Sequence, residues 1–123
     1  MAMALEGVRI IDASGPIGHY AGRLLADLGA DVIRVEAPGG SSARRVGPFV
    51  DDEPGDERSL YWWAYARNTR SVVLDPEAAS DRDEILRLIA GADFLVESAQ
   101  PGRMAGLGLG YEDLSRLNPS LVY

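Results

Sequence analysis

The sequence predicts an α/β fold, a Rossmann-like open parallel sheet with helices on both faces. Two observations carry this prediction. Short runs of β-branched and apolar residues alternate with segments whose apolar residues recur every three or four positions. The strand-like runs are nearly continuous in apolar residues, which is typical of parallel strands covered on both faces. A length of 123 residues fits one domain with its own core.

The first strand, helix and second strand are predicted over residues 8–13, 18–28 and 31–36. The first run follows Gly7 and is rich in β-branched residues. Four large apolar residues then recur at helical spacing: Tyr20, Leu24, Leu25 and Leu28. Gly29 comes directly after them and is a natural left-handed end for the helix. The run Asp-Val-Ile-Arg-Val-Glu supplies the second strand.

The middle of the chain predicts a long loop, a short aromatic helix and a third strand. Residues 37–59 are rich in Gly, Pro, Ser and acidic side chains, and loops of such length in compact domains are usually functional or mobile. Residues 60–66 contain Trp62, Trp63 and Tyr65, which we expect to pack beneath the sheet. Residues 70–74 form the third predicted strand.

The last part of the chain predicts two more helices and a fourth strand. Residues 81–89 carry apolar residues on one face, and Ser80 is positioned to cap their first turn. Residues 93–97 form the fourth strand, and its terminal Glu97 is expected to accept backbone N–H bonds from the following loop. Residues 111–117 predict another helix, and residues 121–123 resemble the start of a fifth strand. The expected strand order is 3-2-1-4, with any fifth element beyond strand four.

Ligands of such sheets bind outside the carboxyl ends of the strands, where the strand order reverses. The strand-end segments here are 14–19, 37–40, 74–77 and 98–103. The first of them is a glycine-rich turn that enters a helix, a place where backbone N–H groups can face an anion. Its glycines do not follow the G-x-G-x-x-G spacing, although Glu36 imitates the ribose-binding acid of NAD enzymes. Close packing of helix on strand explains these glycines as well as a ligand does.

Composition excludes several classes of function. The net charge of −7 opposes nucleic-acid binding, which needs a clustered excess of basic residues. The absence of cysteine removes disulfides and thiolate chemistry, and with His19 as the single histidine no metal site is expected. No apolar run approaches the length of a membrane span, and no secretion signal opens the chain, so we expect a cytoplasmic protein without membrane contact.

Short sequence motifs carry a more specific signal than the periodicity of the chain. Ordered motifs extend over essentially the whole chain: 5–12 (LEGVRIID), 24–40 (LLADLGADVIRVEAPGG), 67–72 (RNTRSV), 92–98 (ADFLVES), 101–102 (PG), 107–111 (LGLGY) and 117–123 (LNPSLVY). Together they resemble the opening of class III CoA-transferases, the CaiB/BaiF type. The resemblance implies that residues 1–123 are an N-terminal CoA-binding Rossmann-like domain, a fragment of a longer family chain.

The resemblance also implies the chemistry. Members of this family form interlocked dimers and move CoA between carboxylic acids through an aspartyl anhydride. The reactive aspartate lies beyond the Asn-Pro-x-Leu-Val-Tyr motif, so we expect it beyond Tyr123 and expect this chain alone to be inactive. Two alternatives remain: a fragment of an α-methylacyl-CoA racemase, whose acid-base pair also lies further on, or a non-catalytic CoA-binding or assembly module. His19 matches neither catalytic role.

CoA or an acyl-CoA is therefore the expected ligand, and the family's contacts transfer by position. They fall on the strand-end loops at Ile17, Gly18, Ala37, Leu74, Asp75, Ser98, Ala99 and Gln100. The family often has Lys where this chain has Pro76 or Glu77, and Asn-Phe where it has Ser98-Ala99. Loss of a cation and of a ring that stacks on adenine predicts weak binding. Arg103 and Arg70 are the candidates for replacing the missing charge.

Overall fold

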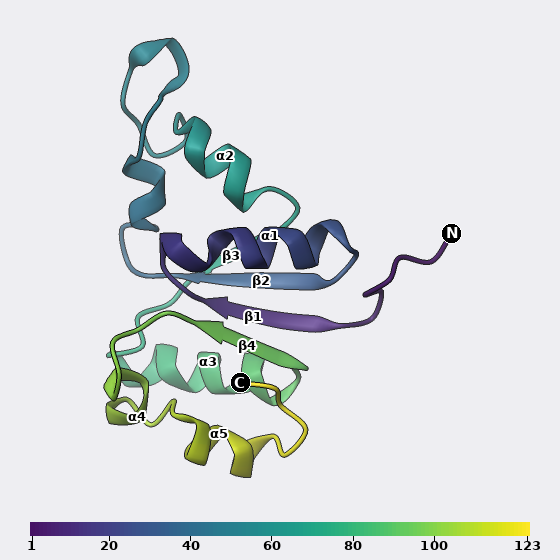
Figure 1. Cartoon of the computed structure of the whole chain (residues 1–123). Coiled ribbons are helices and arrows are strands. Elements are labelled where there is room, and N and C mark those ends of the chain that lie inside the picture. The colour runs from purple at the N-terminus through teal and green to yellow at the C-terminus, as the bar shows by residue number, and fades with distance from the viewer.

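The computed structural model describes residues 1–123 and contains one parallel four-stranded sheet. The strands are β1 (Arg9–Ala13), β2 (Asp31–Glu36), β3 (Arg70–Val73) and β4 (Phe94–Glu97), in the order β3-β2-β1-β4 (Figure 1). The predicted α/β class and strand order are confirmed. Val122 forms an isolated parallel bridge with Phe94, so the expected fifth element lies beyond β4 as a single bridge.

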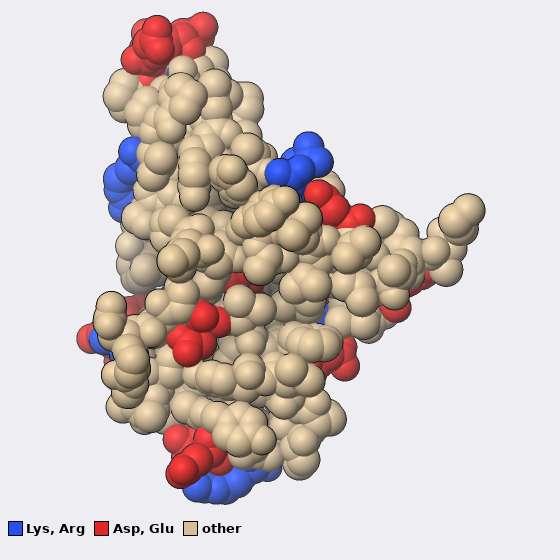
Figure 2. All heavy atoms as spheres, in the orientation of Figure 1, with Lys and Arg blue, Asp and Glu red and all other residues tan.

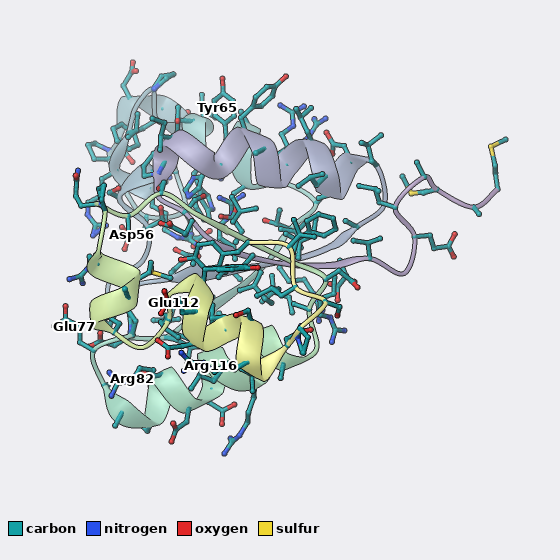
Figure 3. The ribbon with its side chains drawn as sticks, turned by 60° about the horizontal axis from the view of Figure 1, so that its bottom comes forward. Asp56, Tyr65, Glu77, Arg82, Glu112 and Arg116 are labelled. Atoms are coloured by element: carbon teal, nitrogen blue, oxygen red, sulfur yellow. The ribbon has the colours of Figure 1, made fainter.

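Helices cover both faces of the sheet (Figure 1). On one side lie α1 (His19–Asp27) and α2 (Leu60–Ala66). On the other lie α3 (Ala79–Ala90), α4 (Arg103–Gly106) and α5 (Tyr111–Leu117), as the turned view in Figure 3 also shows. Three 3₁₀ turns, η1 (Pro16–Gly18), η2 (Ser42–Arg45) and η3 (Val50–Asp52), complete the chain. None of the helices is both long and apolar enough to cross a bilayer.

The two faces of the sheet each bury a core of their own. Successive side chains of a strand point to opposite faces, so Ile10 and Ile11 enter different cores. Ile10 packs with Val32 beneath α1. Ile11 belongs to the larger core, which includes residues of β4, α3 and α5: Leu95, Ile85, Ile89 and Leu114. Burial on both sides explains why these strands are continuous apolar runs in the sequence.

An ion pair interrupts the apolar pattern at the centre of the sheet. The parallel register places Asp12 of β1 beside Arg34 of β2, and both side chains are fully buried. Arg34 Nη1 lies 3.2 Å from Asp12 Oδ2. Gly22 of α1 lies directly over this pair, since a Cβ at Gly22 would approach Asp12 Oδ2 to 2.5 Å. The glycine therefore lets α1 pack closely on the two strands.

Replacing Gly22 by Ala is expected to lower the free energy of unfolding by about 1–3 kcal/mol, because the added methyl overpacks a buried site. Urea denaturation followed by circular dichroism measures the change. Gly106→Ala is the matched control, since a Cβ there meets nothing within 4 Å. Ala has the higher helix propensity, so the control should be neutral or slightly stabilising. Equal stability of the two variants would contradict the close approach at Gly22.

The aromatic helix lies elsewhere than predicted. α2 packs mainly on α1 and η2. It meets the sheet through one side chain, the Arg34 guanidinium of β2, which donates to the Tyr65 carbonyl at 3.3 Å. Trp62 is buried with Ala43 and Ala66, whereas Trp63 is 51% exposed. The prediction that Trp63 packs beneath the sheet is therefore wrong. A helix of seven residues has room for one buried face only, and Trp62 occupies it.

One further expectation, the Ser80 cap, needs correction. Ser80 does not cap α3: the N-cap residue is Ala78, which makes no side-chain cap. The Asp81 carboxylate accepts a hydrogen bond from the Asp75 N–H at 2.9 Å.

The long loop 37–59 contains the turns η2 and η3 and projects as an arm beyond α2 (Figure 1). Figure 2 shows acidic side chains gathered at the tip of this arm, where the exposed acidic residues of segment 51–57 lie.

Candidate functional site

Two cavities open at the carboxyl edge of the sheet, where the sequence predicted a ligand. One is polar, with a volume of about 430 Å³, and the other is apolar, with a volume of about 170 Å³. Ala13, Val35 and Ala37, at the ends of β1 and β2, line both cavities. The cavities are therefore neighbours, and one elongated ligand can extend from one to the other along the strand ends.

The apolar cavity is formed by β-strand ends, α3, α4 and the loop after β3. Its lining includes Leu74, Pro76, Ile85, Ile89, Leu95, Ala99, Arg103, Met104, Leu107 and Leu109. Four of the predicted contact residues meet here: Ala37, Leu74, Ala99 and Arg103. A mainly apolar pocket with one cationic side chain is suited to a ligand with an apolar part and an anionic group.

Arg103 is the cation of this cavity and already has a partner. Its Nη2 lies 2.7 Å from Glu77 Oε1, and the two side chains are 52% and 61% exposed. An ion pair so exposed contributes little to stability. The guanidinium can therefore exchange Glu77 for an anionic ligand at small cost.

The other predicted contacts lie around the cavities and line neither of them. Ile17 is 87% exposed and, with Gly18, belongs to η1. Asp75 accepts the Glu77 N–H at 2.9 Å and shapes its own loop. Ser98 Oγ accepts a hydrogen bond from the Gly15 N–H at 2.8 Å, which ties the end of β4 to the glycine-rich turn. Gln100 is exposed, and its carbonyl accepts the Arg103 N–H at 3.0 Å.

Two side chains singled out in the sequence have structural partners. Glu97 Oε2 accepts the Ala99 N–H at 2.5 Å, as predicted for the loop after β4. Arg70 lies at the start of β3 and forms a bidentate pair with Asp31, with distances of 2.6 and 2.7 Å from its Nη2. This is the amino edge of the sheet, opposite the cavities, so Arg70 cannot supply charge to a ligand there.

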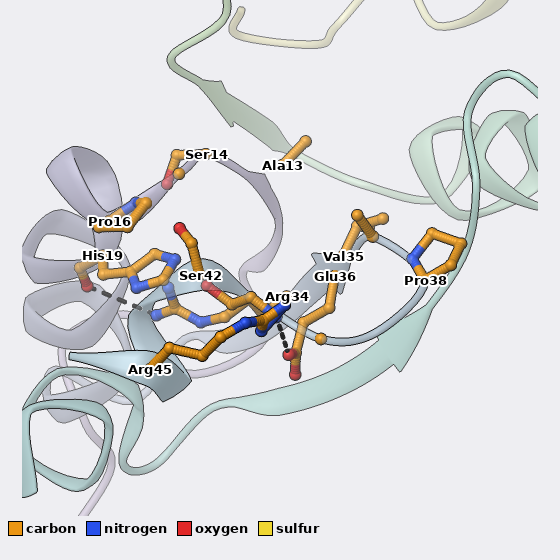
Figure 4. A pocket seen from close by; sticks show the side chains of 14 residues that line it. Ala13, Ser14, Pro16, His19, Arg34, Val35, Glu36, Pro38, Ser42 and Arg45 are labelled. Carbon is orange, nitrogen blue, oxygen red and sulfur yellow. Dashed lines mark hydrogen bonds between the residues drawn. The ribbon is translucent and has the colours of Figure 1, made fainter. Parts of the chain in front are cut away.

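The polar cavity lies between the glycine-rich turn, the end of β2 and η2 (Figure 4). Its polar lining includes Ser14, His19, Arg34, Glu36, Ser42 and Arg45, and Figure 4 shows His19 beside Pro16 and Ser14. The sequence singled out segment 14–19 and Glu36 but not Arg34, Ser42 and Arg45. Arg45 follows the strand-end segment 37–40 within the same loop, and that was the available signal.

Glu36 is fully occupied by donors from its own surroundings. Arg44 Nε and Nη2 donate to its two carboxylate oxygens at 2.7 and 2.8 Å, and the Ser41 N–H donates at 2.7 Å. Ser71 Oγ donates to Oε1 as well. The hydrogen bonds from Arg44 above all lower the pKa of Glu36 to about 2. A carboxylate so engaged is a structural link between β2, η2 and β3, which removes the basis for the NAD alternative.

His19 is buried at the start of α1, with its ring edge-on to Trp62 at 5.8 Å between centroids. Burial, reinforced by the neighbouring Arg34 cation, lowers the pKa of His19 to about 4. The imidazole is therefore neutral at neutral pH and contributes no charge to the polar cavity.

Comparison with known proteins agrees with this architecture. The sequence model of CoA-transferase family III matches residues 5–123. The chain is 46% identical over 122 residues to the succinyl-CoA:(R)-benzylsuccinate CoA-transferase subunit BbsE of Thauera aromatica, and 39% identical over 123 residues to the probable fatty acyl-CoA transferase Rv3272 of Mycobacterium tuberculosis. These matches cover 99% of this chain and 30% and 31% of those proteins.

Solved structures show the same fold. A CaiB/BaiF family protein from Brucella suis superposes with a TM-score of 0.91 at 36% identity, covering 100% of this chain and 33% of that one. The Rv3272 crystal structure gives a TM-score of 0.87 at 38% identity, covering 99% of this chain and 32% of that one. The chain thus spans about a third of the length of the relatives it matches, and it belongs to CoA-transferase family III.

Proposed function

We propose that residues 1–123 form the CoA-binding domain of a CoA-transferase that moves CoA between carboxylic acids. The observation that carries this proposal is the apolar cavity at the carboxyl edge of the sheet, where Ala37, Leu74, Ala99 and Arg103 meet in a chain of this family. The adenine ring would lie against the apolar walls, and Arg103 would bind a phosphate.

The electrostatics of the chain make this binding weak. The net charge of −7 opposes a polyanionic ligand everywhere except where local cations face it. Competition from Glu77 for Arg103 adds a small further cost, because the pair is exposed. We therefore expect a Kd of tens of micromolar or weaker, equivalent to about 6 kcal/mol.

Catalysis requires more than these residues supply. The aspartate nucleophile that the family resemblance implies has no match in this chain, so we propose that residues 1–123 alone bind CoA without transferring it. We also propose that the full-length protein forms a homodimer, as the family resemblance implies. An assay of acyl exchange with the purified chain should show no turnover.

The acid substrates are proposed to be dicarboxylic acids. Several similar proteins are named for transfers that involve such acids, among them succinyl-CoA:mesaconate CoA-transferase of Haloarcula hispanica and succinate–glutarate CoA-transferase of Agrobacterium fabrum. They are 42% and 41% identical to this chain. The polar cavity beside the proposed CoA site offers the polar surroundings that a second carboxylate needs.

Replacing Arg103 by Ala is expected to weaken CoA binding by about 1–3 kcal/mol, which is a factor of roughly 5 to 150, because a charge-assisted hydrogen bond to phosphate is lost. Calorimetric titration of CoA measures the effect. Glu77→Gln should strengthen binding, since it removes the carboxylate that competes for Arg103. Arg116→Ala, on α5, is the control and should bind like the wild type. An unchanged affinity in the Arg103 variant would place the phosphates elsewhere.

A further inference from the structure

The arginines near the polar cavity differ in whether a carboxylate neutralises them. Arg34 faces Asp12 at 3.2 Å, and Arg44 faces Glu36 at 2.7 Å. Arg45 forms no ion pair: both of its terminal nitrogens contact the Gly39 carbonyl oxygen at 3.3 Å. Arg34 and Arg44 are each neutralised by a carboxylate, whereas the exposed Arg45 guanidinium is not. The cavity is therefore left with one uncompensated positive charge.

The inner wall of the same cavity contains buried polar atoms without partners. His19 Nδ1 and Arg34 Nε have no hydrogen-bond partner within the chain, and these side chains belong to residues that are 1% and 0% exposed. Such atoms are uncommon in folded proteins, because a buried donor or acceptor without a partner is destabilising. Both residues line the cavity (Figure 4). Their presence indicates a wall suited to a polar ligand group rather than to an apolar one.

The charge of the cavity favours a carboxylate over a phosphate. The guanidinium fork of arginine matches a carboxylate in a bidentate geometry. One uncompensated positive charge balances one carboxylate. A phosphate dianion would carry a second negative charge that nothing balances, and this doubles its repulsion by the Glu36 carboxylate in the same lining. The shared residues Ala13, Val35 and Ala37 place this charge beside the apolar cavity proposed for CoA.

We propose that Arg45 binds the second carboxylate of a dicarboxylic acid in the polar cavity and makes this chain prefer dicarboxylic to monocarboxylic acids. The inference rests on the proposed function, because it assigns a residue to the acid substrate of that reaction. His19 and Arg34 form the polar wall behind the bound group. Arg45 acts through direct contact with the carboxylate.

The test compares two acids with the same number of carbons. Succinate and butyrate are titrated separately into the ¹⁵N-labelled chain, and the Arg45 Nε–Hε signal and the Ser42 amide are followed by NMR. Succinate is expected to shift both signals with an affinity about tenfold higher than that of butyrate. Arg45→Gln should remove this preference by weakening succinate about tenfold. Arg116→Gln, which alters an exposed arginine on α5, should keep it.

Three outcomes would overturn the inference: equal affinities of succinate and butyrate for the wild-type chain, a preference that survives in Arg45→Gln, or inorganic phosphate binding at Arg45 more tightly than succinate. CoA is titrated into the same samples. A chain that binds no CoA contradicts the proposed function, whether or not Arg45 selects succinate. A chain that binds CoA but does not distinguish the two acids contradicts this inference alone.

Discussion

Replacing Asp12 by Asn is expected to lower the free energy of unfolding by about 3–5 kcal/mol. The substitution keeps the size of the side chain and removes its charge. Arg34 would then remain fully buried without its counter-charge, and the field of the Asp12 carboxylate is what makes that burial tolerable. Since domains of this size are stable by about 5–15 kcal/mol, the loss is a large fraction of the total.

Urea denaturation at pH 7 measures the effect on Asp12. Asp113→Asn provides the control, because Asp113 pairs with Arg116 at 3.3 Å on the surface of α5 and should change stability by less than about 1 kcal/mol. A similar small change in both variants would show that the Asp12–Arg34 pair is not the buried charge pair described above.

Acidification from pH 7 to pH 5 is expected to destabilise the chain by about 2 kcal/mol through His19. Its pKa in the folded chain is about 4, below the ordinary value of 6.5, because the ring is buried. Between these two pKa values His19 is protonated in the unfolded state and neutral in the folded state, so the free energy of unfolding falls as the pH falls. Glu36, with a pKa lowered from 4.5 to about 2, adds a further loss below pH 4.5.

The His19 contribution is separable by mutation. His19→Gln should have a urea midpoint that changes little between pH 7 and pH 5, whereas the wild-type midpoint should fall. Glu36→Gln should keep the wild-type fall in this window, because Glu36 titrates only below it. A wild-type midpoint that is constant from pH 7 to pH 5 would mean that His19 is accessible to protons in the folded chain.

The strands were predictable because a strand buried on both faces is a nearly continuous run of apolar residues. The run Asp31–Glu36 was bounded correctly, and the strand order followed from the predicted parallel sheet and the family resemblance. The position of α2 was not predictable, because an aromatic run fits a layer on the sheet and a layer on α1 equally well. Burial of Trp62 and exposure of Trp63 depend on where η2 lies, and that turn has no strong local signal.

The sequence predicted the location of the candidate site at the strand ends, but it did not predict the role of every residue there. Strand ends must meet at one edge, so Ala37, Leu74, Ala99 and Arg103 were brought together as expected. The roles of arginines depend instead on which acid lies opposite each one, which local sequence does not encode. Arg70 is paired with Asp31 at the amino edge, while Arg45, in the loop after β2, has no acidic partner.

The most direct measurement is an NMR titration of CoA into the ¹⁵N-labelled chain, with the shifted amides mapped on the structure. Binding at tens of micromolar or weaker should shift signals around the apolar cavity, at Ala37, Leu74, Ala99 and Arg103 above all. Amides of the acidic segment 51–57 should not change. An absence of shifts at millimolar CoA, or shifts confined to segment 51–57, would contradict CoA binding at the strand ends.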